Sequence, residues 1–170
     1  MAEAFNGKAL PSVKAERYTE VAQEIAAVLE GEANPVARMA TVAAMLAQSF
    51  DQFFWTGFYL VDPAKPDELV VGPYQGTLGC LRIGFGQGVC GKVANDRRTI
   101  VVPDVEAFPG HIACDSRSRS EIVVPVIGEG GRLLGVLDVD AAELAAFDET
   151  DAEWLERILA QAFGDNASLT

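Results

Sequence analysis

The chain has 170 residues, of which 49% are hydrophobic and 22% are charged, a balance typical of one globular domain and not of a disordered or collagen-like chain. Lys and Arg number 13 against 25 Asp and Glu, and the formal net charge of −12 argues against nucleic acid and anionic membrane surfaces as partners. No signal-like segment opens the sequence, and no apolar run approaches the roughly 20 residues that cross a bilayer, so we expect a cytoplasmic protein.

Two helices are expected near the N-terminus. Apolar residues recur at helical period between residues 14 and 31, and the stretch ends on glycine, which commonly caps a helix C-terminus. Asn34 followed by Pro35 is a typical helix start, and this second helix should extend to about Phe50. Residues 1–13 should be flexible or peripheral. We expect both helices to cover one face of a sheet.

The middle of the chain has the composition of β-strands. Segments rich in aromatic and β-branched residues alternate with turns that contain Gly, Pro and polar residues. The predicted strands are Phe53–Val61, Glu68–Gly76, Leu81–Ile83, Thr99–Val102, Glu121–Ile127 and Arg132–Val139. Pro63–Asp67 should join the first two strands as a hairpin. Gly128–Gly131 should join the last two, because glycine readily adopts the positive φ angles of a tight turn.

A third long helix is predicted at the C-terminal end. Asp148 is a typical N-cap residue, and an apolar stripe follows it over residues 149–163, leaving 164–170 as a tail. Helices at both ends of a set of hairpins predict an α+β fold, in which helices pack on a mixed or antiparallel sheet. We therefore expect a single domain over residues 1–170.

The cysteines are the first candidates for chemistry. Cys80, Cys90 and Cys114 all lie near element ends or in the irregular segment 103–120, where a side chain can meet solvent. A free cysteine is often only a small buried hydrophobe, but a recycling redox centre needs one thiolate that attacks and a second thiol that resolves the product. The glycines of Gly86–Gly91 should hold Cys90 at a helix N-terminus, where backbone N–H groups favour a thiolate.

Two other interpretations of this region are disfavoured. A zinc site made of the cysteines and His111 is not expected, since only His111 and Cys114 are as close in sequence as ligand pairs usually are; we predict no metal. Gly86–Gly91 matches a dinucleotide-binding pattern, but the further βαβ units of that fold are missing. His111 is instead a minor candidate for favouring a Cys114 thiolate.

A second group of candidates is acidic and aromatic. Asp138 and Asp140 are two residues apart at the end of an apolar strand, so their side chains share a face, and Glu121 opens another apolar strand. These carboxyls are explained either by solvation at strand ends or by an anionic pocket that takes an ammonium group and supplies a proton. Trp55 and Tyr59 are candidates for the apolar wall of such a pocket.

Six short blocks of the sequence resemble, in the same order, those of the free methionine-(R)-sulfoxide reductases. They are FWTGFYL at Phe54–Leu60, GPYQG at Gly72–Gly76, GQGVCG at Gly86–Gly91, GHIACD at Gly110–Asp115, SEIVVP at Ser120–Pro125 and GVLDVD at Gly135–Asp140. The resemblance implies a GAF-like α+β fold with an antiparallel sheet of about six strands, flanked by N-terminal and C-terminal helices. It also implies an oxidoreductase without a bound cofactor.

Residue roles are implied by the same resemblance. Cys114 corresponds to the catalytic cysteine, which attacks the sulfoxide sulfur and becomes a sulfenic acid. Cys80 resembles the resolving thiol that forms a disulfide with it, and Cys90 resembles a third cysteine that serves as an alternative resolving or attacking thiol. The substrate-binding residues would be Glu121, Asp138, Asp140, Trp55 and Tyr59.

Partners are implied in the same way. Free methionine sulfoxide would be the substrate, and thioredoxin, itself reduced by NADPH through thioredoxin reductase, would restore the dithiol in a response to oxidative stress. A homodimer is also suggested. Two other functions fit the same residues: a non-catalytic GAF-type module that senses a small molecule, and a thiol peroxidase in which Cys114 reacts with peroxide.

Overall fold

A computed structural model describes residues 10–165 of the chain. Its helices are α1 (Leu10–Val28), α2 (Pro35–Ser49), α3 (Gly88–Asp96) and α4 (Glu149–Phe163). Its strands are β1 (Trp55–Asp62), β2 (Lys65–Gln75), β3 (Arg82–Gly84), β4 (Ile100–Val102), β5 (Ser120–Ile127) and β6 (Leu133–Ala141). Two short 3-10 turns, η2 (Val105–Ala107) and η3 (Glu129–Gly131), complete the order.

The strands form one six-stranded antiparallel sheet with the order β3-β2-β1-β6-β5-β4. Each predicted strand is present within a few residues of its expected bounds, which confirms the α+β fold class. The first hairpin is tighter than expected, because β2 already begins at Lys65. The two long hairpins meet at the centre of the sheet, where β1 lies beside β6.

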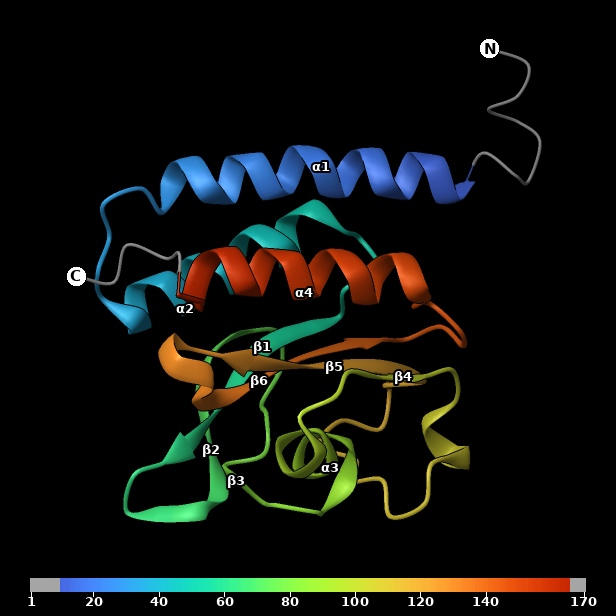
Figure 1. The fold of residues 1–170 in the computed structure, drawn as a ribbon. Coiled ribbons are helices and arrows are strands. Elements are labelled where there is room, and N and C mark those ends of the chain that lie inside the picture. Colours follow the sequence, from blue (N-terminus) through green and yellow to red (C-terminus); the bar gives the residue numbers. More distant parts are fainter. Residues whose placement is uncertain (1–9, 166–170) are drawn as a thin grey trace.

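The helices are divided between the two faces of the sheet (Figure 1). Helices α2 and α4 pack on one face, α3 packs on the other, and α1 lies on α2 and α4 as an outer layer. The expectation that both N-terminal helices cover the sheet is therefore correct only for α2. Helix α1 begins at Leu10 and so includes residues 10–13, which were expected to be peripheral; residues 1–9 and 166–170 lie outside the described range.

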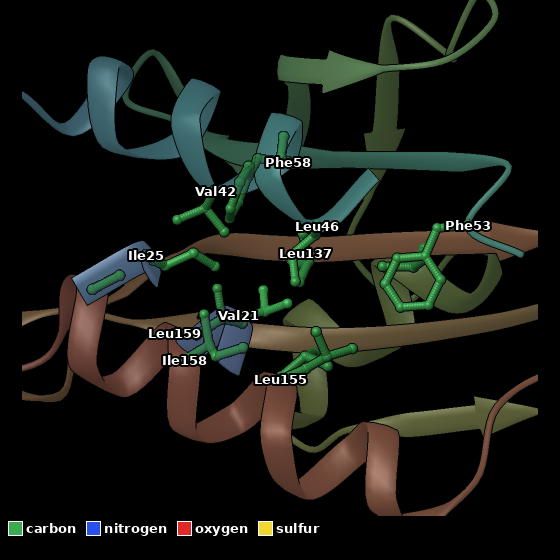
Figure 2. Packing of buried hydrophobic residues seen from close by; sticks show 14 of the residues in the cluster. Val21, Ile25, Val42, Leu46, Phe53, Phe58, Leu137, Leu155, Ile158 and Leu159 are labelled. Atoms are coloured by element: carbon green, nitrogen blue, oxygen red, sulfur yellow. The ribbon is translucent and has the colours of Figure 1, made fainter. Parts of the chain in front are cut away.

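The main core lies between the sheet and the pair α2 and α4 (Figure 2). Phe58 and Leu137 from the central strands meet Leu46 and Leu155 from the two helices, and all four side chains are fully buried. Burying a side chain of this size contributes about 1.5–3 kcal/mol. Because side chains alternate along a strand, the residues between these core positions face α3 on the other side.

Local signals at the helix ends account for their positions. The Asn34 side chain accepts hydrogen bonds from the first turn of α2, and Asp148 forms a capping box with Asp151 at the start of α4. Buried Asp151 also accepts a hydrogen bond from the Tyr18 hydroxyl at 2.7 Å and so ties α4 to α1. Among the helices between residues 10 and 165, none combines the length and hydrophobicity that a membrane span requires.

Candidate active site

The register of the sheet assembles the acidic and aromatic candidates on one face. Asp140 on β6 lies opposite Trp55 on β1 and opposite Glu121 on β5. Asp138 and Tyr59 lie at even spacing from these positions and therefore face the same side, toward α3. All five side chains line one cavity of about 40 Å³, which is enough for ordered water. The structure thus brings together every predicted substrate-binding residue.

A disulfide lies beside this cavity. Cys80, in the segment between β2 and β3, is bonded to Cys114, in the segment before β5, with a Cα–Cα distance of 5.5 Å. Cys114 is exposed and lines the cavity, whereas Cys80 is half-buried. The Tyr59 hydroxyl has a hydrogen bond with the Cys80 backbone, so the aromatic wall helps to position the disulfide. Cys114 therefore lies at the cavity and not in the core.

The expectation of an exposed, thiolate-favouring Cys90 is wrong. Cys90 lies in the first turn of α3, but its side chain is only 4% exposed. Burial raises the pKa of the Cys90 thiol well above its usual value, and the charges of Asp138, Glu121 and Asp140 raise it further. The helix N-terminus acts in the opposite direction but is the weaker influence. The sequence does not reveal that this helical turn packs against the acidic face of the sheet.

The three carboxyls that line the cavity, Glu121, Asp138 and Asp140, have raised pKa values. Burial, with the nearby charge of Asp140, raises the pKa of Glu121 to about 8. Burial and Glu121 raise the pKa of Asp138 well above its usual range, and burial and Asp138 do the same for Asp140. Neighbouring carboxyls in such a site cannot all ionise together. The cluster therefore holds protons near neutral pH, in the cavity that Cys114 also lines.

Two polar side chains support these carboxyls. The Nε2 atom of His111 lies 3.2 Å from the Oε2 atom of Glu121, and the Ser118 hydroxyl donates a hydrogen bond to Asp140 at 2.7 Å. Burial lowers the pKa of His111, so at neutral pH the contact with Glu121 joins two neutral groups. The partner seen for His111 is thus a carboxyl and not the Cys114 sulfur. Sequence analysis missed Ser118, since it lies in an irregular segment without a periodic signal.

The aromatic wall depends on a glycine. The Trp55 ring stacks between Tyr59 and Tyr74, with ring-centroid distances of 5.6 and 5.1 Å. A Cβ atom at Gly57 would lie 2.2 Å from the Cβ atom of Tyr74, so only glycine lets the stack form. The Trp55 indole N–H also donates to the backbone oxygen of Thr77 at 2.9 Å. These contacts fix the aromatic side chains beside the acidic ones on the same face of the sheet.

Replacing Glu121 with glutamine is expected to flatten the dependence of stability on pH. The pKa of Glu121 rises from 4.5 to about 8 in the fold, so the folded state binds more protons than the unfolded chain between these values. The stability from this group is complete below the lower value and is lost as pH rises through the higher one. Because glutamine does not ionise, the variant should have the higher Tm at about pH 9.

Thermal unfolding at several pH values measures this difference. Glu106→Gln, which changes an exposed carboxyl away from the cavity, is the matched control and should follow the parent at each pH. Parallel Tm curves for Glu121→Gln and the parent would show that Glu121 ionises as it does in the unfolded chain.

This chain is similar in sequence to known proteins. The sequence profile of the GAF domain matches residues 33–162. The chain is 49% identical over 146 residues to GAF domain-containing protein A of Dictyostelium discoideum, covering 86% of this chain and 90% of that protein. It is 39% identical over 133 residues to the free methionine-R-sulfoxide reductase of Saccharomyces cerevisiae, covering 76% and 74% of the two chains.

A solved structure is similar as well. The free methionine-R-sulfoxide reductase of Neisseria meningitidis, in complex with its substrate, is 52% identical and superimposes with a TM-score of 0.82, covering 86% of each chain.

Proposed function

Because the chain belongs to the GAF-domain family of free methionine-R-sulfoxide reductases, we propose that it reduces free L-methionine (R)-S-oxide to methionine, with Cys114 as the nucleophile. One observation carries this proposal: Cys114 of the Cys80–Cys114 disulfide lines a cavity that also holds the buried carboxyls of Glu121 and Asp138 and the half-buried carboxyl of Asp140. Sulfoxide reduction needs this pairing, since the oxygen leaves the substrate sulfur only when it is protonated.

In the first step, the thiolate of Cys114 attacks the sulfoxide sulfur while a carboxyl protonates the sulfoxide oxygen. We assign the proton to Glu121, whose pKa of about 8 keeps it protonated at neutral pH and lets it release the proton when needed. The oxygen is transferred to the Cys114 sulfur as a sulfenic acid, and methionine leaves. The substrate sulfur gains the two electrons that the cysteine sulfur loses.

In the second step, the Cys80 thiol attacks the sulfenic sulfur of Cys114, and the oxygen departs as water. The disulfide and its Cα–Cα distance of 5.5 Å support Cys80 as the resolving thiol. Burial and the raised pKa of Cys90 disfavour it in either thiol role, so we restrict its contribution to the wall of the cavity.

Recognition of a free amino acid follows from the charge of the cavity. No Lys or Arg side chain lines it within residues 10–165, so the carboxyls have no cationic partner of their own there. The ammonium group of a free amino acid would supply one, while Trp55 and Tyr59 would contact the apolar end of the substrate. A methionine sulfoxide inside a peptide has no ammonium group and should be rejected for that reason.

We further propose that thioredoxin reduces the disulfide. Exposed apolar side chains surround it: Leu78 is 77%, Leu81 is 71% and Ile112 is 37% exposed, and each lies within two residues of one of the bonded cysteines. An apolar surface beside a disulfide suits a protein partner that carries a dithiol, because burying the surface favours docking over the bond. Location in the cytoplasm and assembly as a homodimer stay predictions.

Replacing Leu81 with aspartate should weaken that docking. We expect the KM for thioredoxin to rise by about tenfold, since a buried apolar anchor at an interface is worth more than about 1 kcal/mol. Turnover with a small dithiol should stay at the parent rate. Leu144→Asp, which changes another exposed leucine away from the disulfide, is the matched control. An unchanged KM in Leu81→Asp would remove this surface from the thioredoxin interface.

The test of the proposed function is NADPH oxidation coupled through thioredoxin reductase and thioredoxin. The (R) epimer of free methionine sulfoxide should be turned over, and the (S) epimer and peptide-bound sulfoxide should not. Hydrogen peroxide, supplied alone, distinguishes a thiol peroxidase. If no substrate drives NADPH oxidation and no thiol is consumed, the protein is not a reductase and the sensing function is favoured.

A further inference from the structure

A thiol and two carboxyls meet at the base of the cavity. The Cys90 sulfur and one oxygen each from Glu121 and Asp138 lie within 4.8 Å of one another. The three residues are 4%, 5% and 6% exposed, and all of them line the cavity. The Oδ1 atom of Asp138 is buried and has no hydrogen-bond partner among the described residues. A buried acceptor without a partner is costly, which marks this atom as open to a ligand.

We propose that a thiophilic divalent cation such as Zn²⁺ binds here, held by Cys90, Glu121 and Asp138. Zinc accepts one sulfur with carboxylate oxygens in a four-coordinate shell, and three protein ligands leave one position for water. The cavity borders the three donors and provides room for that water. Mg²⁺ and Ca²⁺ prefer shells made only of oxygen, so the thiol selects against them.

The surroundings of the donors favour a cation. Asp140, a half-buried carboxyl, also lines the cavity, and no Lys or Arg in the described part of the chain does so. The cation displaces the thiol proton of Cys90 and any protons on its carboxyl ligands. Its positive charge then balances the negative charges of these ligands in place of the protons. This donor set differs from the cysteine and histidine set that sequence spacing disfavours, because its acids come from β5 and β6 and meet only through sheet register.

The site has a consequence for catalysis, which rests on the proposed function. The carboxyls that would hold the cation are those assigned to the ammonium group and the proton. The cation and free methionine sulfoxide should therefore exclude each other, and Zn²⁺ should act as a competitive inhibitor. The binding itself does not depend on that function.

The experiment uses the oxidised full chain, in which Cys90 is the free cysteine and Cys80 and Cys114 are bonded. Co²⁺ alone is added as a spectroscopic substitute for Zn²⁺, since a cobalt–thiolate charge-transfer band reports ligation by Cys90. We expect one Co²⁺ per chain, displaced by Zn²⁺. Cys90→Ala should abolish the band, and Glu121→Gln should weaken Zn²⁺ binding by about tenfold or more. Glu106→Gln should bind like the parent.

The absence of a thiolate band in the parent would overturn the proposal. So would a band that survives in Cys90→Ala, or equal Zn²⁺ affinity in Glu121→Gln and the parent. If Cys90→Ala does not fold, the comparison of Glu121→Gln with the parent decides alone. Because the absorbance measurement needs no turnover, its outcome does not depend on whether the protein has reductase activity.

Discussion

Replacing Cys114 with serine is expected to lower turnover of free methionine (R)-S-oxide by about 10³-fold or more, because a neutral hydroxyl is a far weaker nucleophile than a thiolate. No sulfenic acid can form on serine, so no disulfide with Cys80 should follow. The rate of methionine formation, measured with a small dithiol as reductant, gives the loss directly. A substrate-binding measurement on the same variant shows whether the cavity is intact.

The other cysteines supply matched controls for this variant. Cys80→Ser should still form one methionine per reduced chain, but thioredoxin should no longer sustain repeated turnover, because no intramolecular disulfide forms. Cys90→Ala should retain both the single turnover of the reduced chain and the repeated turnover with thioredoxin to within about tenfold. If Cys114→Ser keeps turnover while Cys90→Ala loses it, the nucleophile is Cys90 and the assignment of Cys114 is wrong.

Replacing Glu121 with glutamine should reduce the rate of the chemical step by about 10²–10⁴-fold, the range expected for loss of a general acid. The rate of the parent should fall as pH rises through the pKa of about 8 for Glu121, because the acid must be protonated to act. The variant should lack this alkaline fall. Single-turnover rates of the reduced protein across this pH range measure both effects.

Asp140→Asn is the informative comparison for the proton donor. Asp140 is half-buried, and its pKa is also raised, but its partner is the Ser118 hydroxyl. We expect this variant to bind substrate more weakly while keeping the alkaline fall in rate. If instead Glu121→Gln keeps the parent's pH profile and Asp140→Asn loses it, Asp140 is the donor.

The parts of the fold that local sequence determines were predictable. Asn34 and Asp148 cap their helices as expected, since a cap involves only the next few residues. Hairpin pairing follows from alternation of side chains, and the shared face of Asp138 and Asp140 follows from the same rule. The packing of α1 on α2 and α4 was not predictable, because an apolar stripe does not identify what it packs against.

The candidate site, like the fold, was predictable from the sequence only in part. The roles of Cys80 and Cys114 come from the family resemblance and stay predictions, whereas strand spacing already indicated the acids as candidates. The sheet register brings the acids and the aromatic residues to one cavity. The error concerns surroundings that depend on distant segments, because Cys90 is buried by the acidic face beneath α3. The contact of His111 with Glu121 depends on distant segments too and was not predicted. A helix N-terminus in a sequence indicates a local dipole but not the burial or the charges opposite it.

A single turnover without reductant tests the central claim most directly. Reduced protein is mixed with excess free methionine (R)-S-oxide, methionine is quantified, and the resulting disulfide is mapped by mass spectrometry. We predict one methionine per chain, a bond between Cys80 and Cys114, and an unmodified Cys90 thiol. Formation of no methionine with all thiols intact, or a disulfide that includes Cys90, would contradict the account.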